Sequence, residues 1–109
     1  MSINEKIKGL IEKDDVCLFM KGTPDVPQCG FSLAVANVLK HLNVKFGSVN
    51  VLESDEMREG IKTYSNWPTI PQLYVKKEFI GGCDIITEMF ESGELLELFN
   101  TNGIDVNPS

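Results

Sequence analysis

VCLFMKGTPDVPQCGFS, residues 16–32, joins an apolar run to a polar loop and then to the beginning of a helical pattern. The run VCLFM is too short for a buried helix and predicts an interior strand. Pro24 and Pro27 mark the loop, and apolar residues then recur at helical spacing over about residues 30–42. A strand that leads through a loop into a helix is the repeating unit of α/β folds.

The rest of the sequence alternates the same two patterns. Ser2 and Glu5 form a capping box before a first helix, and Asp84 is expected to cap a fourth helix that Gly93 ends. Further elements are expected as a strand at 46–51, a helix at about 54–64, a hairpin of 73–75 and 78–80, and a fifth helix at ELLELF. The order α-β-α-β-α-β-β-α-α predicts an α/β, thioredoxin-like fold, in which about five helices flank a four-stranded mixed sheet.

Length and composition limit the class of protein. The 109 residues predict one domain, with a flexible tail over about residues 101–109. A net charge of −6 argues against nucleic acid as a partner, and no apolar run is long enough to span a membrane. The N-terminal residues lack a secretory pattern, and an acidic residue without arginine argues against an uncleaved transit peptide. We therefore expect a cytoplasmic location of bacterial type, or an organelle matrix if a transit peptide has been removed.

The three cysteines have different surroundings. An odd number in an unsecreted chain indicates free thiols, a metal site or transient redox chemistry. Cys29 opens a helix, where unpaired backbone N–H groups, the helix dipole and nearby Lys21 would stabilise the thiolate. Cys17 lies within the apolar strand and is expected to be a small core residue. Cys83 also lies at a helix start, as a second thiol or, by preference, as a residue of the capping region.

Pro71 and the residues after the hairpin suggest a peptide-binding site. A proline at a strand entrance can be cis, which would turn backbone groups outward toward an extended ligand, and the sequence leaves cis and trans open. The pair at 81–82 is Gly-Gly, which permits close backbone approach, and Asp84 offers a carboxylate and N–H groups. Together with Lys21 and Arg58 these groups could hold a small peptide with two carboxylates and one amine, although a solvated surface role is the simpler reading of each charge alone.

Three segments, MKGTPDVPQCGFS, NWPTIPQLYV and EFIGGCDIITEM, closely resemble the signature segments of the monothiol, CGFS-type glutaredoxins. Their order and spacing match along nearly the whole chain. The resemblance implies a thioredoxin-like fold, glutathione binding, and a [2Fe-2S] cluster shared between two monomers. One departure is the hairpin turn VKKEF, where family members often have a glycine.

The resemblance also implies a set of site residues. Cys29 matches the cysteine that acts as the catalytic thiol and the cluster ligand. Lys21 and Arg58 match basic residues that contact the glycyl carboxylate of glutathione. The remaining matches are Ile70, whose backbone pairs with the tripeptide, and Cys83 with Asp84, which hold its γ-glutamyl end.

Ser32 stands where a C-x-x-C motif would carry its second thiol, so Cys29 cannot form the local disulfide of a dithiol enzyme. A [2Fe-2S] cluster takes four thiolates, which two chains and two glutathiones supply as a homodimer. The expected function is a cluster carrier between scaffold and apo-acceptor proteins, with at most weak glutathione-dependent oxidoreductase activity. Two alternatives stay open: a true oxidoreductase that removes glutathione from mixed disulfides, and a regulatory module that reports redox or iron status through BolA-like partners.

Overall fold

The computed structural model describes residues 1–106 of the chain. In chain order, its elements are α1 (Ile3–Lys13), β1 (Val16–Met20), α2 (Gly30–His41), β2 (Gly47–Asn50), the short 3-10 helix η1 (Val51–Glu53), α3 (Asp55–Ser65), β3 (Gln72–Val75), β4 (Glu78–Gly81), α4 (Cys83–Ser92) and α5 (Glu94–Thr101). Apart from η1, this is the predicted order. None of the helices in this part of the chain is long and apolar enough to cross a membrane.

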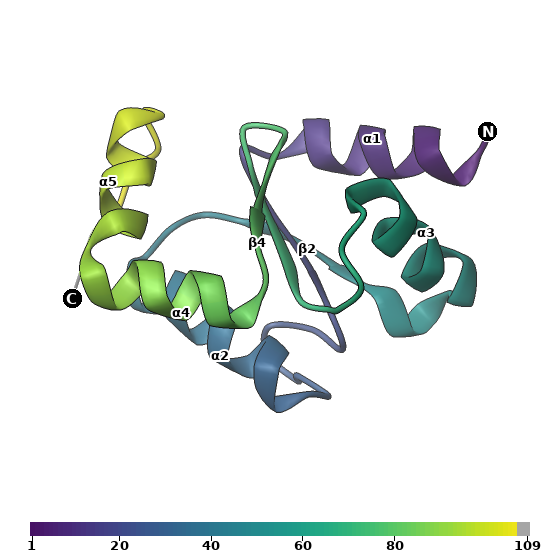
Figure 1. The fold of residues 1–109 in the computed structure, drawn as a ribbon, viewed down its shortest axis with the longest axis horizontal. Coiled ribbons are helices and arrows are strands. Elements are labelled where there is room, and N and C mark those ends of the chain that lie inside the picture. Colours follow the sequence, from purple (N-terminus) through teal and green to yellow (C-terminus); the bar gives the residue numbers. More distant parts are fainter. Residues whose placement is uncertain (107–109) are drawn as a thin grey trace.

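The four strands form one mixed sheet in the order β2-β1-β3-β4. β1 pairs in parallel with β2 and antiparallel with β3, and β3 pairs antiparallel with β4. Figure 1 shows α1 and α3 together on one side of the sheet and α2 and α4 together on the other, with α5 beyond α4. The predicted thioredoxin-like arrangement is confirmed.

Strand β1 supplies side chains to two cores because successive residues of a strand point to opposite faces. Leu18 and Met20 pack with α2, α4 and α5, whereas Cys17 and Phe19 pack with α1 and α3. All five residues of β1 are buried, which explains why its sequence is a continuous apolar run. The central strand is thus held from both sides, and its end is a rigid starting point for the loop that follows.

The turn between β3 and β4 has two lysines in the left-handed region. Lys76 has a φ of 50° and Lys77 has a φ of 73°, the conformation that favours glycine or asparagine in two-residue hairpins. The Lys76 N–H donates to the Asp15 carbonyl at 2.7 Å, and the two lysine side chains pair with Asp15 and Glu12 at 3.3 and 3.8 Å. These contacts with the end of α1 hold the β3–β4 turn, which has lysines where family members often have a glycine.

One detail of the predicted C-terminal half differs. Asp84 does not cap α4, because Gly82 takes the extended N-cap conformation and places Asp84 inside the first turn. The N–H of Ile104 donates to the Phe99 carbonyl at 2.9 Å, and the Ile104 side chain is buried in the core within the tail predicted from residue 101 onward. Residues 107–109 of that tail lie outside the described residues. Gly93 ends α4 in the left-handed conformation, as predicted.

Candidate functional site

The loop between β1 and α2 is closed by its own backbone. Gly22 has a φ of +91°, and a Cβ there would lie 2.5 Å from the Val26 carbonyl oxygen, so glycine is required. The Gln28 N–H donates to the Lys21 carbonyl at 2.9 Å, and Thr23 and Val26 exchange backbone hydrogen bonds. The loop therefore brings Lys21, at its beginning, next to Cys29, at its end.

Cys29 is the N-cap residue of α2 and is half-buried. Its thiol pKa is lowered from the ordinary value, first by the backbone N–H of Ser32, against an opposing effect of burial. The N–H of Phe31, the charge of Lys21 and the Ser32 hydroxyl lower the pKa further. These are the groups expected at a helix N-terminus, and they favour the thiolate, which is the form of cysteine that acts as a nucleophile and as a ligand for soft metals.

Ser32 has a structural role besides occupying the position of a second cysteine. Its side chain is fully buried, and its Oγ accepts a hydrogen bond from the Lys21 N–H at 3.0 Å. The hydroxyl thus joins the first turn of α2 to the end of β1. From the sequence, Ser32 was predicted only as a missing thiol, and this bond was not foreseen.

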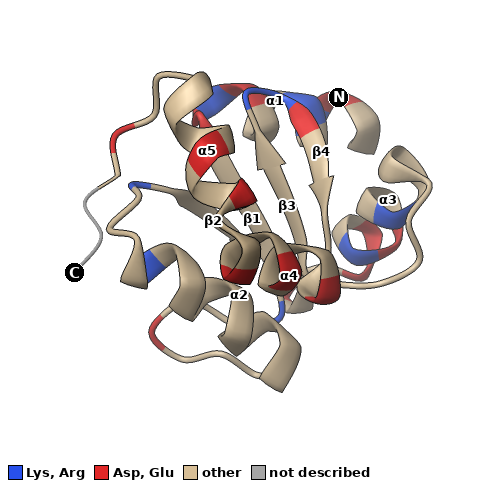
Figure 2. Ribbon diagram, turned by 60° about the vertical axis from the view of Figure 1, so that its left-hand side comes forward, with Lys and Arg blue, Asp and Glu red and all other residues tan. Residues whose placement is uncertain are grey.

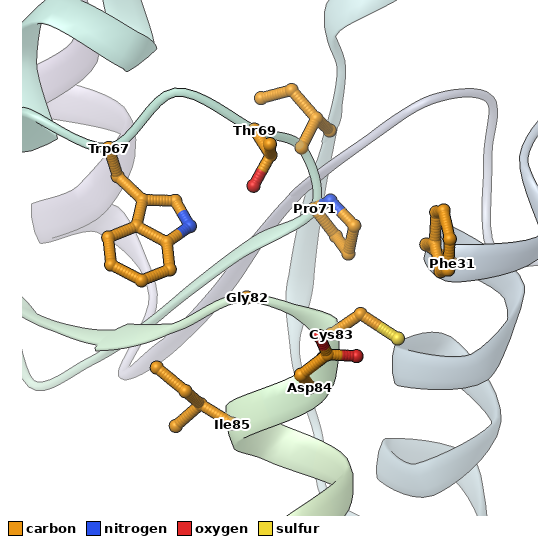
Figure 3. Close-up of a pocket in the computed structure, with 9 residues that line it drawn as sticks. Phe31, Trp67, Thr69, Pro71, Gly82, Cys83, Asp84 and Ile85 are labelled. Atoms are coloured by element: carbon orange, nitrogen blue, oxygen red, sulfur yellow. The ribbon is translucent and has the colours of Figure 1, made fainter.

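A pocket of about 480 Å³ opens beside the first turn of α2. Its walls come from α2, the loop before β3 and the first turn of α4, and its lining residues are Phe31, Trp67, Thr69, Ile70, Pro71, Gly82, Cys83, Asp84 and Ile85. Figure 3 shows Phe31 and Trp67 at opposite ends, with Pro71 between them and Cys83 on the Phe31 side. Phe31 is 63% exposed, which leaves this end of the pocket open.

The structure brings together three of the predicted site residues in the pocket. Ile70, Cys83 and Asp84 line it, whereas Cys29, Lys21 and Arg58 are not among its lining residues. Arg58 lies in the first part of α3, where its guanidinium pairs with Asp55 at 3.1 Å and with Glu59 at 3.6 Å. The peptide bond between Ile70 and Pro71 is cis, which decides the alternative that the sequence left open.

The loop before β3 is held by a buried glutamine. Gln72 donates through Nε2 to the carbonyls of Trp67 and Thr69, both at 3.2 Å, and accepts from the Tyr74 hydroxyl at 3.2 Å. Beside it, Trp67 Nε1 is buried without a hydrogen-bond partner among the described residues. A Cβ at Gly82 would lie 3.2 Å from this nitrogen, so the glycine keeps the space next to it free. Trp67 and Thr69 belong to the segment NWPTIPQLYV but were not predicted as lining residues.

Cys17 and Cys83 contrast with Cys29. Cys17 is buried, and burial raises its thiol pKa to about 12, with a further contribution from Asp14. Its predicted role as a core residue is confirmed. Cys83 is half-buried in the first turn of α4, with its Sγ 4.0 Å from Thr87 Oγ1. Within residues 1–106 no group of three or more His, Cys, Asp or Glu side chains could hold a metal ion.

Charge is distributed unevenly around the pocket. After Lys77 the sequence contains no lysine or arginine. Figure 2 accordingly shows only acidic charges on α4 and α5. The positive charge that lowers the pKa of Cys29 belongs to Lys21 in the β1–α2 loop, and α4 and α5 contribute none.

Comparison with known proteins identifies sequences and structures that are similar to this chain. The glutaredoxin family model matches residues 16–80. The mitochondrial monothiol glutaredoxin-5 of Saccharomyces cerevisiae is 59% identical over 88% of this chain and 66% of its own length. The rice monothiol glutaredoxin-S11 is 57% identical over 86% of this chain but only 19% of its own length. The solution structure of reduced poplar apo GrxS14 is 50% identical, with a TM-score of 0.81 over 92% of each chain. The chain thus spans about a fifth of the rice relative.

Proposed function

The chain belongs to the monothiol glutaredoxin family, and from that premise we propose that it binds glutathione beside Cys29 and carries a [2Fe-2S] cluster between two copies of itself. The observation that carries this proposal is the environment of Cys29. The thiol has a lowered pKa and lies next to an open pocket, and the position of a resolving cysteine is taken by a fully buried serine. The local disulfide of a C-x-x-C motif is therefore unavailable to Cys29, and the thiol of glutathione can replace the missing sulfur.

Glutathione fits the groups around the pocket. The exposed carboxylate of Asp84 and the backbone N–H groups of the first turn of α4 would hold the charged γ-glutamyl end. The backbone of Ile70 would pair with the extended tripeptide, and Lys21 would attract its glycyl carboxylate. Arg58 would join Lys21 only by exchanging its present acidic partners for the ligand.

The cluster is cargo in this proposal. A [2Fe-2S] cluster takes four thiolates, and one chain with one glutathione offers two. No group of three or more potential metal ligands occurs among the described residues, and we expect the remaining ligands from glutathione and from a second copy. A half-exchangeable ligand set suits transfer from a scaffold to apo-acceptor proteins, with BolA-like proteins as further partners. We propose the cytoplasm or an organelle matrix as the compartment, and the yeast relative is named as mitochondrial.

Anaerobic reconstitution with iron, sulfide and glutathione tests the proposal. Wild type should show the visible absorption of a [2Fe-2S] cluster, one cluster per two chains, and a dimer by light scattering. Cys29→Ser should lose cluster and dimer together, whereas Cys17→Ser and Cys83→Ser should keep both. A cluster that survives Cys29→Ser, or that forms without any added thiol, would contradict the ligand set.

The lowered Cys29 pKa also favours a second candidate, removal of glutathione from mixed disulfides. The Cys29 thiolate attacks the glutathione sulfur and forms a new disulfide, and the substrate leaves as its thiolate. A second glutathione thiolate then attacks the bound glutathione sulfur, which releases glutathione disulfide and restores Cys29. Turnover of a glutathionylated peptide by wild type, and its loss in Cys29→Ser, would support this activity. Cluster content does not enter the assay, so the two candidates are separable.

A further inference from the structure

The side chain of Asn50 accepts two backbone hydrogen bonds with one oxygen. Its Oδ1 accepts from the Gly22 N–H at 2.9 Å and from the Leu52 N–H at 3.0 Å. The residue ends β2 and pairs in register with Met20, the last residue of the parallel strand β1. Asn50 therefore lies where the two strands end side by side, and it holds the chain that leaves each of them.

The residue before Gly22 is held as well. The Lys21 N–H donates to Ser32 Oγ at 3.0 Å, so two successive amides after β1 are taken by side chains from different elements. Ser32 belongs to α2, on one side of the sheet, and Asn50 leads through η1 into α3, on the other side. The backbone on both sides of the Lys21 side chain is thereby fixed in place.

We propose that Asn50 is a positioning residue of the glutathione site, which holds Lys21 in place to bind the ligand's glycyl carboxylate. The inference rests on the proposed function, because it concerns the same site. Asn50 does not touch the ligand in this proposal. It acts through the backbone of Gly22, the residue that follows Lys21. Gly22 has a φ of +91°, a conformation that favours glycine.

The same oxygen caps η1, after which Ser54 Oγ accepts from the Met57 N–H at 3.1 Å and begins α3. Arg58 lies in the turn that follows. One asparagine thus ties the loop that carries the site lysine to the segment that carries the site arginine. The attraction between the Lys21 ammonium and the glycyl carboxylate weakens as their distance grows. Loss of the Asn50 hydrogen bonds should therefore weaken binding of this end of glutathione more than binding of its γ-glutamyl end.

The test compares glutathione with its glycine-amide analogue, which lacks the terminal negative charge. Calorimetry gives both dissociation constants for wild type, Asn50→Leu and Asn50→Asp. Wild type should bind glutathione about tenfold or more tightly than the amide, as one charge-assisted contact implies. Asn50→Leu keeps the size of the side chain but removes its hydrogen-bond acceptor. The ratio of the two dissociation constants, amide analogue over glutathione, should therefore fall toward one. Asn50→Asp keeps an acceptor for both N–H groups, so its ratio should lie above that of the leucine variant.

Two controls separate positioning from general damage. Asn102→Leu removes another side-chain hydrogen bond, from Asn102 Nδ2 to the Leu98 carbonyl at 2.8 Å in α5, and should leave the ratio unchanged. In a Lys21→Ala background, Asn50→Leu should change the ratio little further, since both act on one interaction. Circular dichroism monitors folding, and Asn50→Ala repeats the measurement if the leucine variant does not fold.

The outcomes distinguish this inference from the function on which it rests. If wild type binds no glutathione, the proposed function fails and the inference falls with it. If wild type discriminates against the amide and the folded Asn50→Leu or Asn50→Ala variant keeps the same ratio, the positioning role is refuted while the proposed function stands. An Asn50→Asp ratio no higher than that of Asn50→Leu would also refute the hydrogen-bond mechanism.

Discussion

Iodoacetamide at pH 7 should alkylate Cys29 at least about a thousandfold faster than Cys17. Only the thiolate reacts, and a thiol whose pKa is about 12 is ionised in roughly one molecule in 10⁵ at this pH. The pKa of Cys29 lies below its ordinary value of 9.0, so more than about one molecule in a hundred is ionised. Burial of Cys17 widens the difference, because the reagent reaches it only when the sheet opens.

The assay is a time course of intact mass followed by peptide mapping of the modified cysteines. The rate at Cys29 should reach half of its maximum at a pH below 9.0, and Ser32→Ala should shift this midpoint upward because the hydroxyl that favours the thiolate is gone. Cys29→Ser serves as the control, in which fast alkylation disappears. Modification of Cys17 within tenfold of the rate at Cys29 in the folded protein would refute the reasoning.

Four further changes have defined expectations. Ser32→Cys should allow a disulfide between Cys29 and the introduced thiol on oxidation, measured by mass, and a gain of thiol-disulfide activity, measured by turnover. It should also weaken the hydrogen bond from the Lys21 N–H, because sulfur is a poorer acceptor than the Ser32 hydroxyl. Gln72→Leu should destabilise the fold by about 2–4 kcal/mol in urea unfolding, since it leaves two carbonyls and a hydroxyl without a partner. Cys17 should lower stability by about 1.4 kcal/mol per pH unit from about pH 9 to pH 12, because the unfolded chain ionises Cys17 while the folded chain does not. Cys17→Ala should remove this part of the slope, whereas the part due to Tyr74, whose pKa burial raises to about 12, should stay. Trp67 is the single tryptophan, so glutathione should change the intrinsic fluorescence, and an unchanged spectrum at saturating ligand would place the peptide elsewhere.

Local patterns were sufficient for most elements of the fold. The capping box of Ser2 and Glu5, the end of α4 at Gly93 and the buried strand β1 all depend on neighbours within a few residues, and each is confirmed. The N-terminus of α4 shows the limit of such patterns. Aspartate and glycine are both accepted at an N-cap, and only the path of the chain out of β4 decides that Gly82 takes the position instead of Asp84.

The candidate site was predictable in part for the same reason. Cys29 was identified because its activation comes from the helix that it opens, which is a local property. Phe31 and Trp67 were missed as pocket residues because the sequence around an aromatic residue does not show which distant segment lies opposite to it. Arg58 was predicted to contact the glycyl carboxylate of glutathione together with Lys21, but the ion pairs that it makes with Asp55 and Glu59 depend on side-chain geometry within α3.

By itself, the sequence determined the order of the elements, the reactive thiol at a helix start and the absence of a second thiol at Ser32. Hydrophobic periodicity, capping and thiolate stabilisation act between residues close along the chain. Only the tertiary structure decided that Ser32 and Asn50 each accept a hydrogen bond from a backbone N–H just after β1. It also decided that three segments of the chain line one pocket. A serine or asparagine can bond to many partners, and packing of the two helical layers on the sheet selects the ones within reach.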